Sequence, residues 1–592
     1  MDISHKLLQG LTAKLEKKLT RGTIGNAAEW AGKYRWIPVT DTEHPNYKKW
    51  INAINEEEKR KIHVPKNNVL FNFKHHPWAY EMHTCNDEQI VGQKSAQMGY
   101  TEVCMNRAFY ANDILGETVL YVLPTKSNAS DFSNGRFDPA LEASPHLQGL
   151  YSDVKNVGLK RAGAASLYIR GSGSRSELKS IPASKMFFDE VDEMDTTQIV
   201  LAFERMMGQD FVQSFLISTP SYDNVGINYF FKDSSQDHFF FRCPHCGKFI
   251  TMVFDIEDES KSSLVITGDD PSSKEVLKSF YKCYECQGVL KHEEKPNYIN
   301  LDNCQWVPKY SDRHIRGFHV NQFNSHARAA KPSNMAITFL RSRTSPEEEQ
   351  EFYNNKLGIT HAVEGARITD KMIANCMGGH VMLESASPKN RIVTMGIDPG
   401  HSTHYYEICE YIIDNNSPIK DINLLTKARL IKCGIAYSFD EFPKLYQQYK
   451  VNYAVIDAQP QKELSLRFCQ KVQNAKYCYY TDGLRTRKDM RFAENDPDDY
   501  MLTVDRTLWL DISLGRFKSG RILLPKDCPT LYKDHIKTNI RAYHKDKNGN
   551  PVGKYVKGEK ERDDYAHARN YCEIALPFAV SLLHHRNIST IL

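Results

Sequence analysis

The sequence predicts an α/β protein with two sheet-containing domains and a cysteine-bearing insert between them. Three observations support this fold class. Short apolar, β-rich runs alternate with helical segments from about residue 65 to 240, a pattern typical of strand–helix–strand units in a parallel sheet. Two C-x-x-C pairs follow these runs. A second β-rich region begins at residue 391.

The composition is that of an ordinary globular protein. The length of 592 residues corresponds to roughly three to five domains at about 150 residues each. The net charge of +4 is too small to indicate nucleic-acid binding by itself, so any basic surface must be local. No apolar run approaches the roughly 18 residues of a membrane span, and the N-terminus lacks a secretory signal pattern. Most of the 14 cysteines are irregularly spaced, which favours a reducing compartment such as the cytoplasm.

In chain order we expect five segments. They are a helical segment at 1–60, an α/β domain at 61–240, the cysteine-bearing insert at 241–300, a linker region at 301–388 and a second β-rich domain at 389–592. The strands that we expect lie at 117–125, 166–171, 185–190, 212–219, 391–400 and 452–459. The run "SPEEEQEFYNNK" predicts a capped helix within the linker region, and a C-terminal helix is expected near 563–585.

The stretch "VGQKSAQMGYTE" (91–102) resembles a phosphate-binding loop whose lysine is displaced. In the usual loop a lysine follows the second glycine and reaches the phosphates, and the next Ser or Thr ligates Mg²⁺. Here Tyr100 takes the lysine position between Gly99 and Thr101, and Lys94 stands at the start of the loop. Backbone N–H groups do most of the cradling, and a lysine has a long stem, so Lys94 can supply the charge from the front. We assign Lys94, Ser95, Gly99, Tyr100 and Thr101 to ATP binding.

A second nucleotide-site element is the apolar run "KMFFDE", which ends in Asp189 and Glu190. This is the form of a Walker B strand, in which the Asp supports Mg²⁺ and the next acid orients or deprotonates the attacking water. The alternative interpretation is an acidic helix N-terminus, because acids also favour that end of the helix dipole. The order of the elements along the chain favours the nucleotide site.

Two further elements complete this site. Ser218 and Thr219 end the run "FLISTP", where a hydroxyl can sense the γ-phosphate. Hydrolysis also benefits from an arginine that neutralises transition-state charge. Arg175 in "RGSGSRSELKS" is the predicted arginine, and Arg205 is the alternative; each could also be a plain surface arginine.

The two C-x-x-C pairs predict a structural zinc site. Each pair has a glycine next to or close behind its second cysteine, and four thiolates suit tetrahedral Zn²⁺. The long separation between the pairs is tolerated because loop-closure entropy grows only with the logarithm of length. A thioredoxin-like redox site would need only one pair. The predicted ligands are Cys243, Cys246, Cys283 and Cys286.

A second acidic site is predicted in the C-terminal domain. Asp398 in "MGIDPG" and Asp457 in "YAVIDAQ" each end an apolar strand, and Asp563 and Asp564 open a helix. Carboxylates from two strands and one helix suit a two-metal site for phosphodiester cleavage. We prefer Asp564 as the third ligand and expect His567 on its face of the helix. Each acid alone is more often a turn or cap residue, and only the combination favours a nuclease.

A basic hairpin precedes that helix. Residues 541–562 hold seven Lys or Arg against three acids, around an "NGN" turn signal. Such a hairpin beside a metal site would bind a phosphate backbone without sequence preference. The stretch "RTRKDMR" (485–491) either adds to this surface or is a solvated loop.

Together these motifs resemble the large terminase subunit of tailed bacteriophages, in particular the lambda-like gpA group. The resemblance runs through "EWAGKYR", "QKSAQMGYTE", "VLYVLPT", "SGSRSELKS", "FFDEVDEMD", "ISTPSYDNVGI", the two cysteine knuckles and "GFHVNQFNS". It implies an ASCE or RecA-like P-loop ATPase domain with a zinc-ribbon insert, followed by an RNase H-like nuclease domain. Such proteins thread double-stranded DNA into a procapsid and cut the concatemer into genome units.

The resemblance also implies residue roles. It places Lys94, Gly99 and Thr101 in a deviant Walker A loop, Asp189 and Glu190 in Walker B, Ser218 and Thr219 in the coupling motif, and Asp398, Asp457 and Asp564 at the nuclease metals. The implied cofactors are ATP with Mg²⁺, Mg²⁺ or Mn²⁺ at the nuclease, and structural Zn²⁺.

The implied partners are double-stranded DNA, a small terminase subunit and the portal protein, on which the chain would assemble as a homo-oligomeric ring. Residues 1–60 would contact the small subunit or the adenine side of the nucleotide. The implied location is the host cytoplasm, outside the mature virion and away from membranes.

Two other functions fit some of these features. A repair-type helicase-nuclease would need a second RecA-like motor domain, whose motifs we do not find after "ISTP". A catalytically inactive prophage scaffold that binds DNA would not need the acids, all of which are present.

Overall fold

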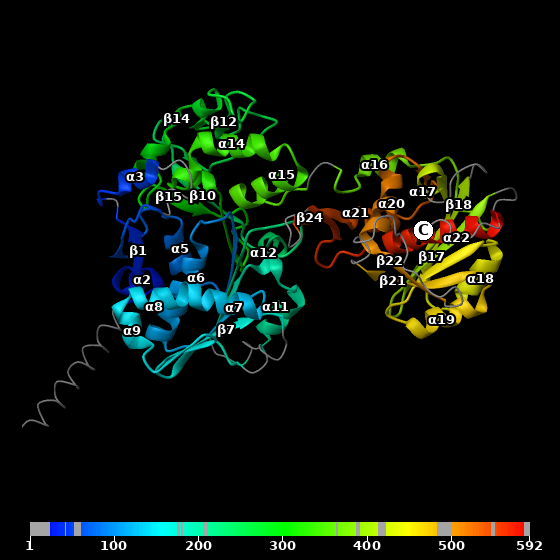
Figure 1. The fold of residues 1–592 in the computed structure, drawn as a ribbon, viewed down its shortest axis with the longest axis horizontal. Helices are drawn as coiled ribbons and strands as arrows, with labels where there is room; N and C mark the ends of the chain where they lie inside the picture. The colour runs from blue at the N-terminus through cyan, green and yellow to red at the C-terminus, as the bar shows by residue number, and fades with distance from the viewer. Residues whose placement is uncertain are drawn as a thin grey trace, which may run out of the picture. The chain divides into compact units, whose positions relative to one another are not determined.

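The computed structural model describes residues 24–41, 43–52, 61–173, 178, 181–204, 208, 211–362, 365–385, 391–412, 422–481, 500–545 and 551–584. The chain divides between His361 and Ala362 into two compact units, and Figure 1 shows helices around a sheet in each. No helix within the described ranges is long and apolar enough to cross a membrane.

The first unit is built on an eleven-stranded sheet. Its order is β11-β10-β16-β3-β9-β8-β4-β7-β6-β5, with β15 paired to β10. The bounds are β3 Gln89–Lys94, β4 Val119–Leu123, β5 Val154–Asn156, β6 Leu159–Ala162, β7 Ala165–Gly171, β8 Lys185–Asp189, β9 Gln213–Ser218, β10 Asp237–Arg242, β11 Phe249–Ile250, β15 Cys304–Val307 and β16 Arg316–Val320. The four strands expected in this unit are confirmed as β4, β7, β8 and β9.

The centre of this sheet is parallel. Strands β16, β3, β9, β8, β4 and β7 all run in one direction, so their carboxyl ends meet at one edge. Side chains of β4 alternate between two cores, as strand geometry requires. Val119 and Tyr121 face one core, and Leu120 and Val122 face the other. Both faces are buried, which explains the continuous apolar runs in the sequence.

Helices cover both faces of the sheet. One face carries α2 (Ala27–Tyr34), α5 (Ala79–Thr84), α6 (Tyr100–Tyr110), α7 (Lys126–Phe132), α8 (Asp138–Ala143) and α9 (Pro145–Leu150), and the other carries α11 (Thr196–Phe203) and α12 (Ile227–Asp233). The segment 1–60 was expected to be helical, but Trp36–Thr40 form strand β1, paired with β2 (Lys66–Leu70). Its β-branched and aromatic residues favour an extended chain.

The expected linker region is largely part of the first unit. Strand β16 lies inside the sheet between β10 and β3, and helices α14 (Pro332–Ser342) and α15 (Pro346–Phe352) follow it. The predicted cap of α15 is confirmed, because the Ser345 side chain accepts a hydrogen bond from the Glu348 N–H. The π-helix η8 (Tyr353–Leu357) continues α15. A three-stranded sheet of β12 (Leu264–Val265), β13 (Phe280–Lys282) and β14 (Val289–Leu290) forms the cysteine-bearing insert.

The second unit holds a seven-stranded sheet in the order β22-β21-β20-β17-β18-β19-β23. Strands β18 and β19 form an antiparallel meander with β17, while β20, β21 and β22 run parallel to β17. The bounds are β17 Ile392–Pro399, β18 His404–Ile412, β19 Lys427–Ala436, β20 Tyr453–Asp457, β21 Ala475–Thr481, β22 Met501–Asp505 and β23 Ile522–Leu523. The two strands expected here are confirmed as β17 and β20.

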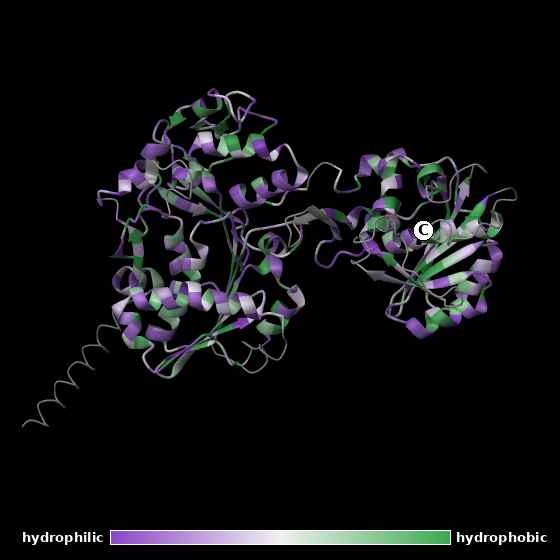
Figure 2. Ribbon diagram, in the orientation of Figure 1, coloured by the Kyte–Doolittle hydropathy of each residue, from purple (hydrophilic) through white to green (hydrophobic). Residues whose placement is uncertain are grey.

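Helix α22 (Asp564–His584) lies across β17 and β18, as Figure 1 shows, and confirms the expected C-terminal helix. Gly396 of β17 permits this close packing, because a Cβ there would lie 2.0 Å from the Ala568 carbonyl oxygen. With α22, helices α16 (Asp370–Asn375), α20 (Arg506–Lys518) and α21 (Thr530–Thr538) contribute to one core, and α18 (Glu441–Gln448) and α19 (Lys462–Lys471) to the other. Figure 2 shows hydrophobic strands at the centre of this unit.

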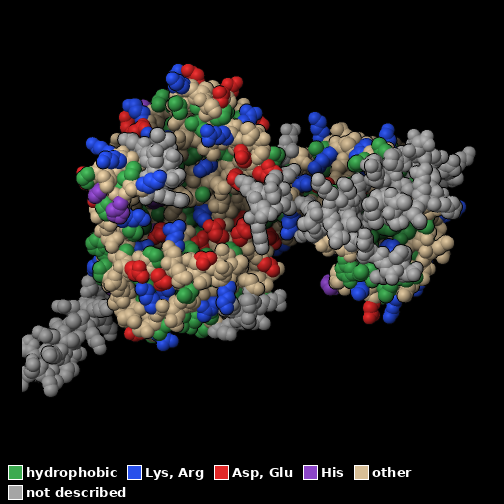
Figure 3. All heavy atoms as spheres, in the orientation of Figure 1, with side chains coloured by type: hydrophobic (Ala, Val, Ile, Leu, Met, Phe, Trp, Pro, Cys, Tyr) green, Lys and Arg blue, Asp and Glu red, His purple; other side chains and the backbone are tan. Residues whose placement is uncertain are grey.

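The predicted basic hairpin is confirmed as β24 (Ile540–Lys545) and β25 (Pro551–Val556). On the face drawn in Figure 3, the basic side chains of the first unit are interspersed with acidic ones. This mixture agrees with the small net charge of the chain.

Candidate functional sites

The predicted phosphate loop connects β3 to α6 at the carboxyl edge of the first sheet. Strand β3 ends at Lys94, and α6 begins at Tyr100. Gly99 has a φ of 82°, in the left-handed region that favours glycine, and a Cβ there would lie 3.3 Å from the His76 ring. The strand–loop–helix arrangement directs the first N–H groups of α6 toward the loop, which suits an anion.

Lys94 forms an ion pair with the predicted Walker B acid. Its Nζ lies 3.0 Å from Glu190 Oε1, and the lysine is only 8% exposed. Burial by itself lowers the pKa of Lys94, but the carboxylates of Asp189 and Glu190 outweigh burial and raise this pKa above its ordinary value. The structure therefore brings a charged Lys94 to the loop and to the end of β8.

Asp189 and Thr101 lie together beside this pair. Thr101 Oγ1 and the Tyr121 hydroxyl each donate to Asp189 Oδ2 at 2.9 Å. The other oxygen, Oδ1, is buried and has no hydrogen-bond partner among the described residues. Burial raises the pKa of Asp189, although Lys94 acts against this shift. An unsatisfied carboxylate oxygen next to a threonine hydroxyl fits a Mg²⁺ ion that both residues help to place.

Tyr100 has a different role from the one expected. Its ring packs on Gly92, where a Cβ would lie 2.6 Å from the ring, and its hydroxyl donates to the Phe318 carbonyl. The residue is 1% exposed. Its side chain is therefore part of the sheet core and not available to a nucleotide, and only its backbone N–H stands at the start of α6.

Contacts from distant parts of the chain hold the loop. The Asn355 carbonyl accepts from the Ala96 N–H at 2.8 Å, and Gln322 Nε2 donates to the Ala96 carbonyl at 2.7 Å. Trp78 Nε1 donates to the Met98 carbonyl at 2.8 Å. Ser95 is fully buried, and its hydroxyl donates to the Val320 carbonyl. Gln322 and Val320 lie in the stretch "GFHVNQFNS", but the sequence alone did not assign any of these supports to the loop, because their contacts depend on packing between distant segments.

Ser218 connects β9 to the turn after Walker B. Its hydroxyl accepts from the Asp192 N–H at 3.2 Å, and Thr219 follows it directly at the end of the strand. The Asp192 carboxylate accepts from the N–H groups of Ser221 (2.7 Å) and Ile227 (2.8 Å). Burial raises the pKa of Asp192 to about 6. Asp192 is thus a linking residue that the sequence showed only as a further acid in "DEVDEMD".

Arg175, the predicted transition-state arginine, and its alternative Arg205 lie outside the described residues.

The four predicted zinc ligands converge. The sulfur atoms of Cys243, Cys246, Cys283 and Cys286 all lie within 4.8 Å of one another. The two knuckles have the same turn: the Gly247 N–H donates to the Cys243 carbonyl, and the Gln287 N–H donates to the Cys283 carbonyl. Four sulfur ligands at this spacing fit a tetrahedral Zn²⁺ ion.

The predicted nuclease acids also converge, at one end of the second sheet. Asp398 and Asp457 stand at the carboxyl ends of the parallel neighbours β17 and β20. Burial, followed by the charges of Asp457, Asp564 and Asp563, raises the pKa of Asp398 well above its ordinary value. The Tyr571 hydroxyl donates to Asp457 Oδ2. Carboxylates whose charges raise the pKa of a neighbouring carboxyl fit divalent cations.

Asp563 and Asp564 differ in their partners. Asp563 is 3% exposed and contacts Lys557 Nζ at 2.5 Å and His567 Nε2 at 3.1 Å. Burial would raise the pKa of Asp563, but these two residues outweigh burial and lower it. Asp564 contacts Arg562 Nε at 2.9 Å. His567 stands within one helical turn of both acids, and its ring contacts Asp563.

The basic hairpin is partly engaged with acids. Arg541 Nη2 lies 2.7 Å from Asp511 Oδ2, and Lys557 contacts Asp563. The stretch 485–491 and the turn at 546–550 lie outside the described residues.

Comparison with known proteins agrees with the resemblance read from the motifs. Residues 67–306 match the family described as "Phage terminase large subunit gpA, ATPase domain". A terminase large subunit of Enterobacteria phage P21 is 24% identical over 232 residues, which are 36% of this chain and 34% of that relative. The match thus spans about a third of the relative's length.

Solved structures of large terminases are also similar. The HK97 bacteriophage large terminase covers 87% of this chain and 96% of its own, at 12% identity and a TM-score of 0.45. The large terminase nuclease from thermophilic phage G20c covers 35% and 97%, at 11% identity and a TM-score of 0.20. Because these scores are low, the fold described above rests on this chain's own strand order. The family match confirms the predicted resemblance: residues 67–306 are similar to the ATPase domain of phage terminase large subunits of the gpA family.

Proposed function

We propose that the protein is a viral DNA-packaging motor. ATP hydrolysis in the first unit drives double-stranded DNA into a procapsid, and a metal-dependent endonuclease in the second unit cuts concatemeric DNA into genome units. The observation that carries this proposal is the cluster of Lys94, Thr101, Asp189 and Glu190 at the loop between β3 and α6. It lies inside the segment that matches the terminase ATPase family.

In the first unit we assign the phosphates to the loop. The N–H groups at the start of α6 and the Lys94 ammonium bind them, while Thr101 and Asp189 hold Mg²⁺, which neutralises charge on the phosphates. Glu190 orients or deprotonates the attacking water. Its ion pair with Lys94 keeps the carboxylate beside the loop. Ser218 and Asp192 link this turn to the segment after β9, and Thr219 stands at the same edge.

In the second unit we assign the metals to Asp398, Asp457 and Asp564. Two divalent cations, Mg²⁺ or Mn²⁺, prepare a water and stabilise the leaving oxygen in such sites. Two neighbouring strands and one helix supply these acids, as in RNase H-like nucleases. Asp563 serves as an anchor, because Lys557 and His567 already neutralise its charge. Through Lys557 this anchor fixes the end of the basic hairpin next to the acids.

We assign a structural Zn²⁺ to the four cysteines. Four thiolate ligands close the coordination shell, so this ion stabilises the ribbon and takes no part in chemistry.

The proposed partners follow from the family. They are double-stranded DNA, a small terminase subunit and the portal protein, with the chain acting as a ring on the portal in the host cytoplasm. The segment 1–60 is the proposed contact for the small subunit or the adenine. Arg175 remains the proposed transition-state arginine.

A defined packaging assay tests the function. Procapsids with portal, small subunit, ATP and linear DNA are incubated with the protein, and DNA protected from added DNase is measured. We expect protection with the wild type, none with Lys94→Ala, and wild-type protection with Lys278→Ala, which removes an exposed lysine paired with Glu275. Protection by Lys94→Ala at the wild-type level would overturn the proposal.

A further inference from the structure

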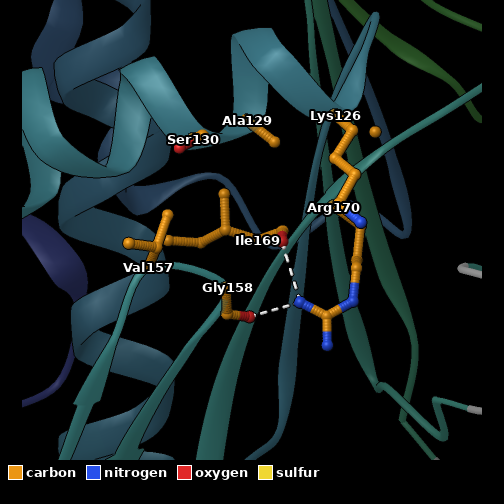
Figure 4. Close-up of a pocket in the computed structure, with 8 residues that line it drawn as sticks. Lys126, Ala129, Ser130, Val157, Gly158, Ile169 and Arg170 are labelled. Atoms are coloured by element: carbon orange, nitrogen blue, oxygen red, sulfur yellow. Dashed lines mark hydrogen bonds between the residues drawn. The ribbon is translucent and has the colours of Figure 1, made fainter.

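A cavity of about 430 Å³ lies at the carboxyl edge of the first sheet, away from the nucleotide loop. Figure 4 shows its walls: the start of α7, the turn between β5 and β6, and the last residues of β7. In the sheet order, β4 and β7 lie beyond β8, on the side away from β3. Neighbouring strands lie about 4.8 Å apart. Because β7 is the second strand from β8 and the fourth from β3, the cavity is close to Walker B but separate from the nucleotide loop.

The cavity is positively charged. Of the eight residues that line it, only Lys126 and Arg170 are charged, and no acid is among them. Lys126 is exposed at the start of α7, and Arg170 is half-buried in β7. Figure 4 draws both basic side chains on one side of the cavity and Val157 on the other. Such a lining attracts an anion.

Arg170 is fixed in place before any ligand binds. Its Nη1 donates to the Ile169 carbonyl at 2.9 Å and to the Gly158 carbonyl, and its guanidinium lies over the Tyr168 ring. Glycine permits this approach, because a Cβ at Gly158 would lie 2.7 Å from Nη1. A guanidinium held this way loses little conformational entropy when it binds a phosphate.

The rest of the lining is apolar. Ala129, Val157 and Ile169 offer contacts that an isolated phosphate ion cannot use. A DNA backbone offers both parts, a charged phosphodiester and an apolar deoxyribose, and the volume is within the range of sites for small organic groups. An acidic protein segment also offers negative charge, but it has no rigid apolar group, such as deoxyribose, next to that charge to contact the apolar wall.

We propose that this cavity binds a phosphodiester group of double-stranded DNA. The inference rests on the proposed packaging function, to which it adds a DNA contact on the ATPase unit. The site lies at the sheet edge that carries Asp189 and Ser218, so DNA bound there sits next to the elements that hydrolysis would move.

The test measures binding of the full-length protein to a 30-base-pair duplex by fluorescence anisotropy, in EDTA and over a range of salt. Arg170→Ala and Lys126→Ala each remove one charge. Val157→Trp narrows the cavity and leaves the charge unchanged. Arg161→Ala is the matched control, because Arg161 is an exposed arginine of the adjacent β6 that does not line the cavity.

We expect each of the two charge variants to weaken binding roughly 3- to 10-fold and to lower the slope of log K against log salt by about 1. We expect Val157→Trp to weaken DNA binding without changing the salt slope. Arg161→Ala should change the DNA affinity by less than about 2-fold. Binding by Arg170→Ala and Val157→Trp equal to that of Arg161→Ala would overturn the proposal. Binding of the same variants to a polyglutamate peptide is measured in parallel. If the charge variants lose binding to the peptide but keep binding to DNA, the cavity binds a protein partner and the proposal is overturned.

ATP hydrolysis separates this test from that of the packaging function. All four variants should hydrolyse ATP in the absence of DNA at the wild-type rate, since none of them touches the loop. A wild type with no ATP hydrolysis, with or without DNA, would count against the packaging function, whereas the DNA-binding comparison decides the cavity on its own.

Discussion

The two candidate active sites of this chain manage charge in opposite ways. In the first unit, each acid has a partner from the loop: Lys94 lies 3.0 Å from Glu190, and Thr101 donates to Asp189. In the second unit, Asp398 and Asp457 end neighbouring strands, and burial with the nearby acids raises the pKa of Asp398. In the function that we propose, Lys94 supplies positive charge to the first site, whereas the second site would take its positive charge from divalent cations.

The two sites should therefore differ in their dependence on a bound metal ion. The loop can bind an anion through N–H groups and Lys94 before any metal contributes. In our proposal, the acidic cluster would accept a phosphate backbone only once divalent cations are bound. Substitutions should therefore change metal dependence in the second unit and nucleotide turnover in the first.

The largest effect is expected from Asp398→Asn. It replaces the carboxylate that ends β17 beside Asp457 on the parallel strand β20 with a neutral amide. We expect plasmid nicking in Mn²⁺ to fall by at least about 100-fold, since residues that merely orient a metal ligand already account for about 10- to 100-fold. Asp440→Asn is the control, because Asp440 is an exposed acid paired with Lys471. Nicking by Asp398→Asn within twofold of this control would exclude Asp398 from the site.

The next effect concerns the first unit. Glu190→Gln keeps the shape of the side chain but removes the base and the charged partner of Lys94. ATP hydrolysis should fall by about 10²- to 10⁴-fold, the usual contribution of a general base, while binding of a fluorescent ATP analogue stays within a few-fold. Nicking should be unchanged. If ATP affinity is lost instead of turnover, Glu190 organises the loop rather than the water.

A smaller effect should come from Tyr571→Phe. The hydroxyl donates to Asp457, and the ring stacks on Tyr480, so the substitution removes the hydrogen bond and leaves the stack. We expect the Mn²⁺ concentration for half-maximal nicking to rise about 10-fold or more. The increase in melting temperature on Mn²⁺ addition should shrink in parallel.

Tyr446→Phe is the matched control for this experiment. The Tyr446 hydroxyl donates to the Asn474 carbonyl, away from the acids. Equal Mn²⁺ dependence of the two variants would show that Tyr571 does not position the metal ligand.

The smallest effect on either activity is expected from Cys283→Ser. Loss of one thiolate should abolish the bound zinc, measured by metal analysis at about one ion per chain in the wild type. We expect a lower melting temperature for the first unit and unchanged Mn²⁺-dependent nicking by the second. If the zinc-free variant has the melting temperature of the wild type, the ion has no structural role.

Much of the fold could be predicted from the sequence. The buried strands β4, β8, β9, β17 and β20 were found because both faces are covered, which leaves continuous apolar runs. The cysteine knuckles and the capped helix α15 have local signals that do not depend on the rest of the chain. Strand β16 was missed because "RGFHV" is short and includes Arg and His, and its place in the sheet is set by pairing with β3 and β10.

The site residues show the same limit. Lys94 and Thr101 were found because their positions in a loop motif carry meaning. The contacts of Asn355, Gln322 and Trp78 with the loop depend on tertiary packing between segments far apart in sequence. The side-chain direction of Tyr100 and the pairing of His567 with Asp563 are set by helix register and neighbours. Motifs therefore singled out residues that the structure brings together, but not the residues that support them.

We propose that this chain holds two independent active sites, and a crossed measurement of both activities tests this most directly. ATP hydrolysis and plasmid nicking, the latter with Mg²⁺ or Mn²⁺ and without ATP, are measured on the same preparations of wild type, Lys94→Ala and Asp457→Ala. We predict that Lys94→Ala loses hydrolysis and keeps nicking, and that Asp457→Ala loses nicking and keeps hydrolysis. Nicking by Asp457→Ala, normal hydrolysis by Lys94→Ala, or joint loss of both activities in folded variants would contradict the account.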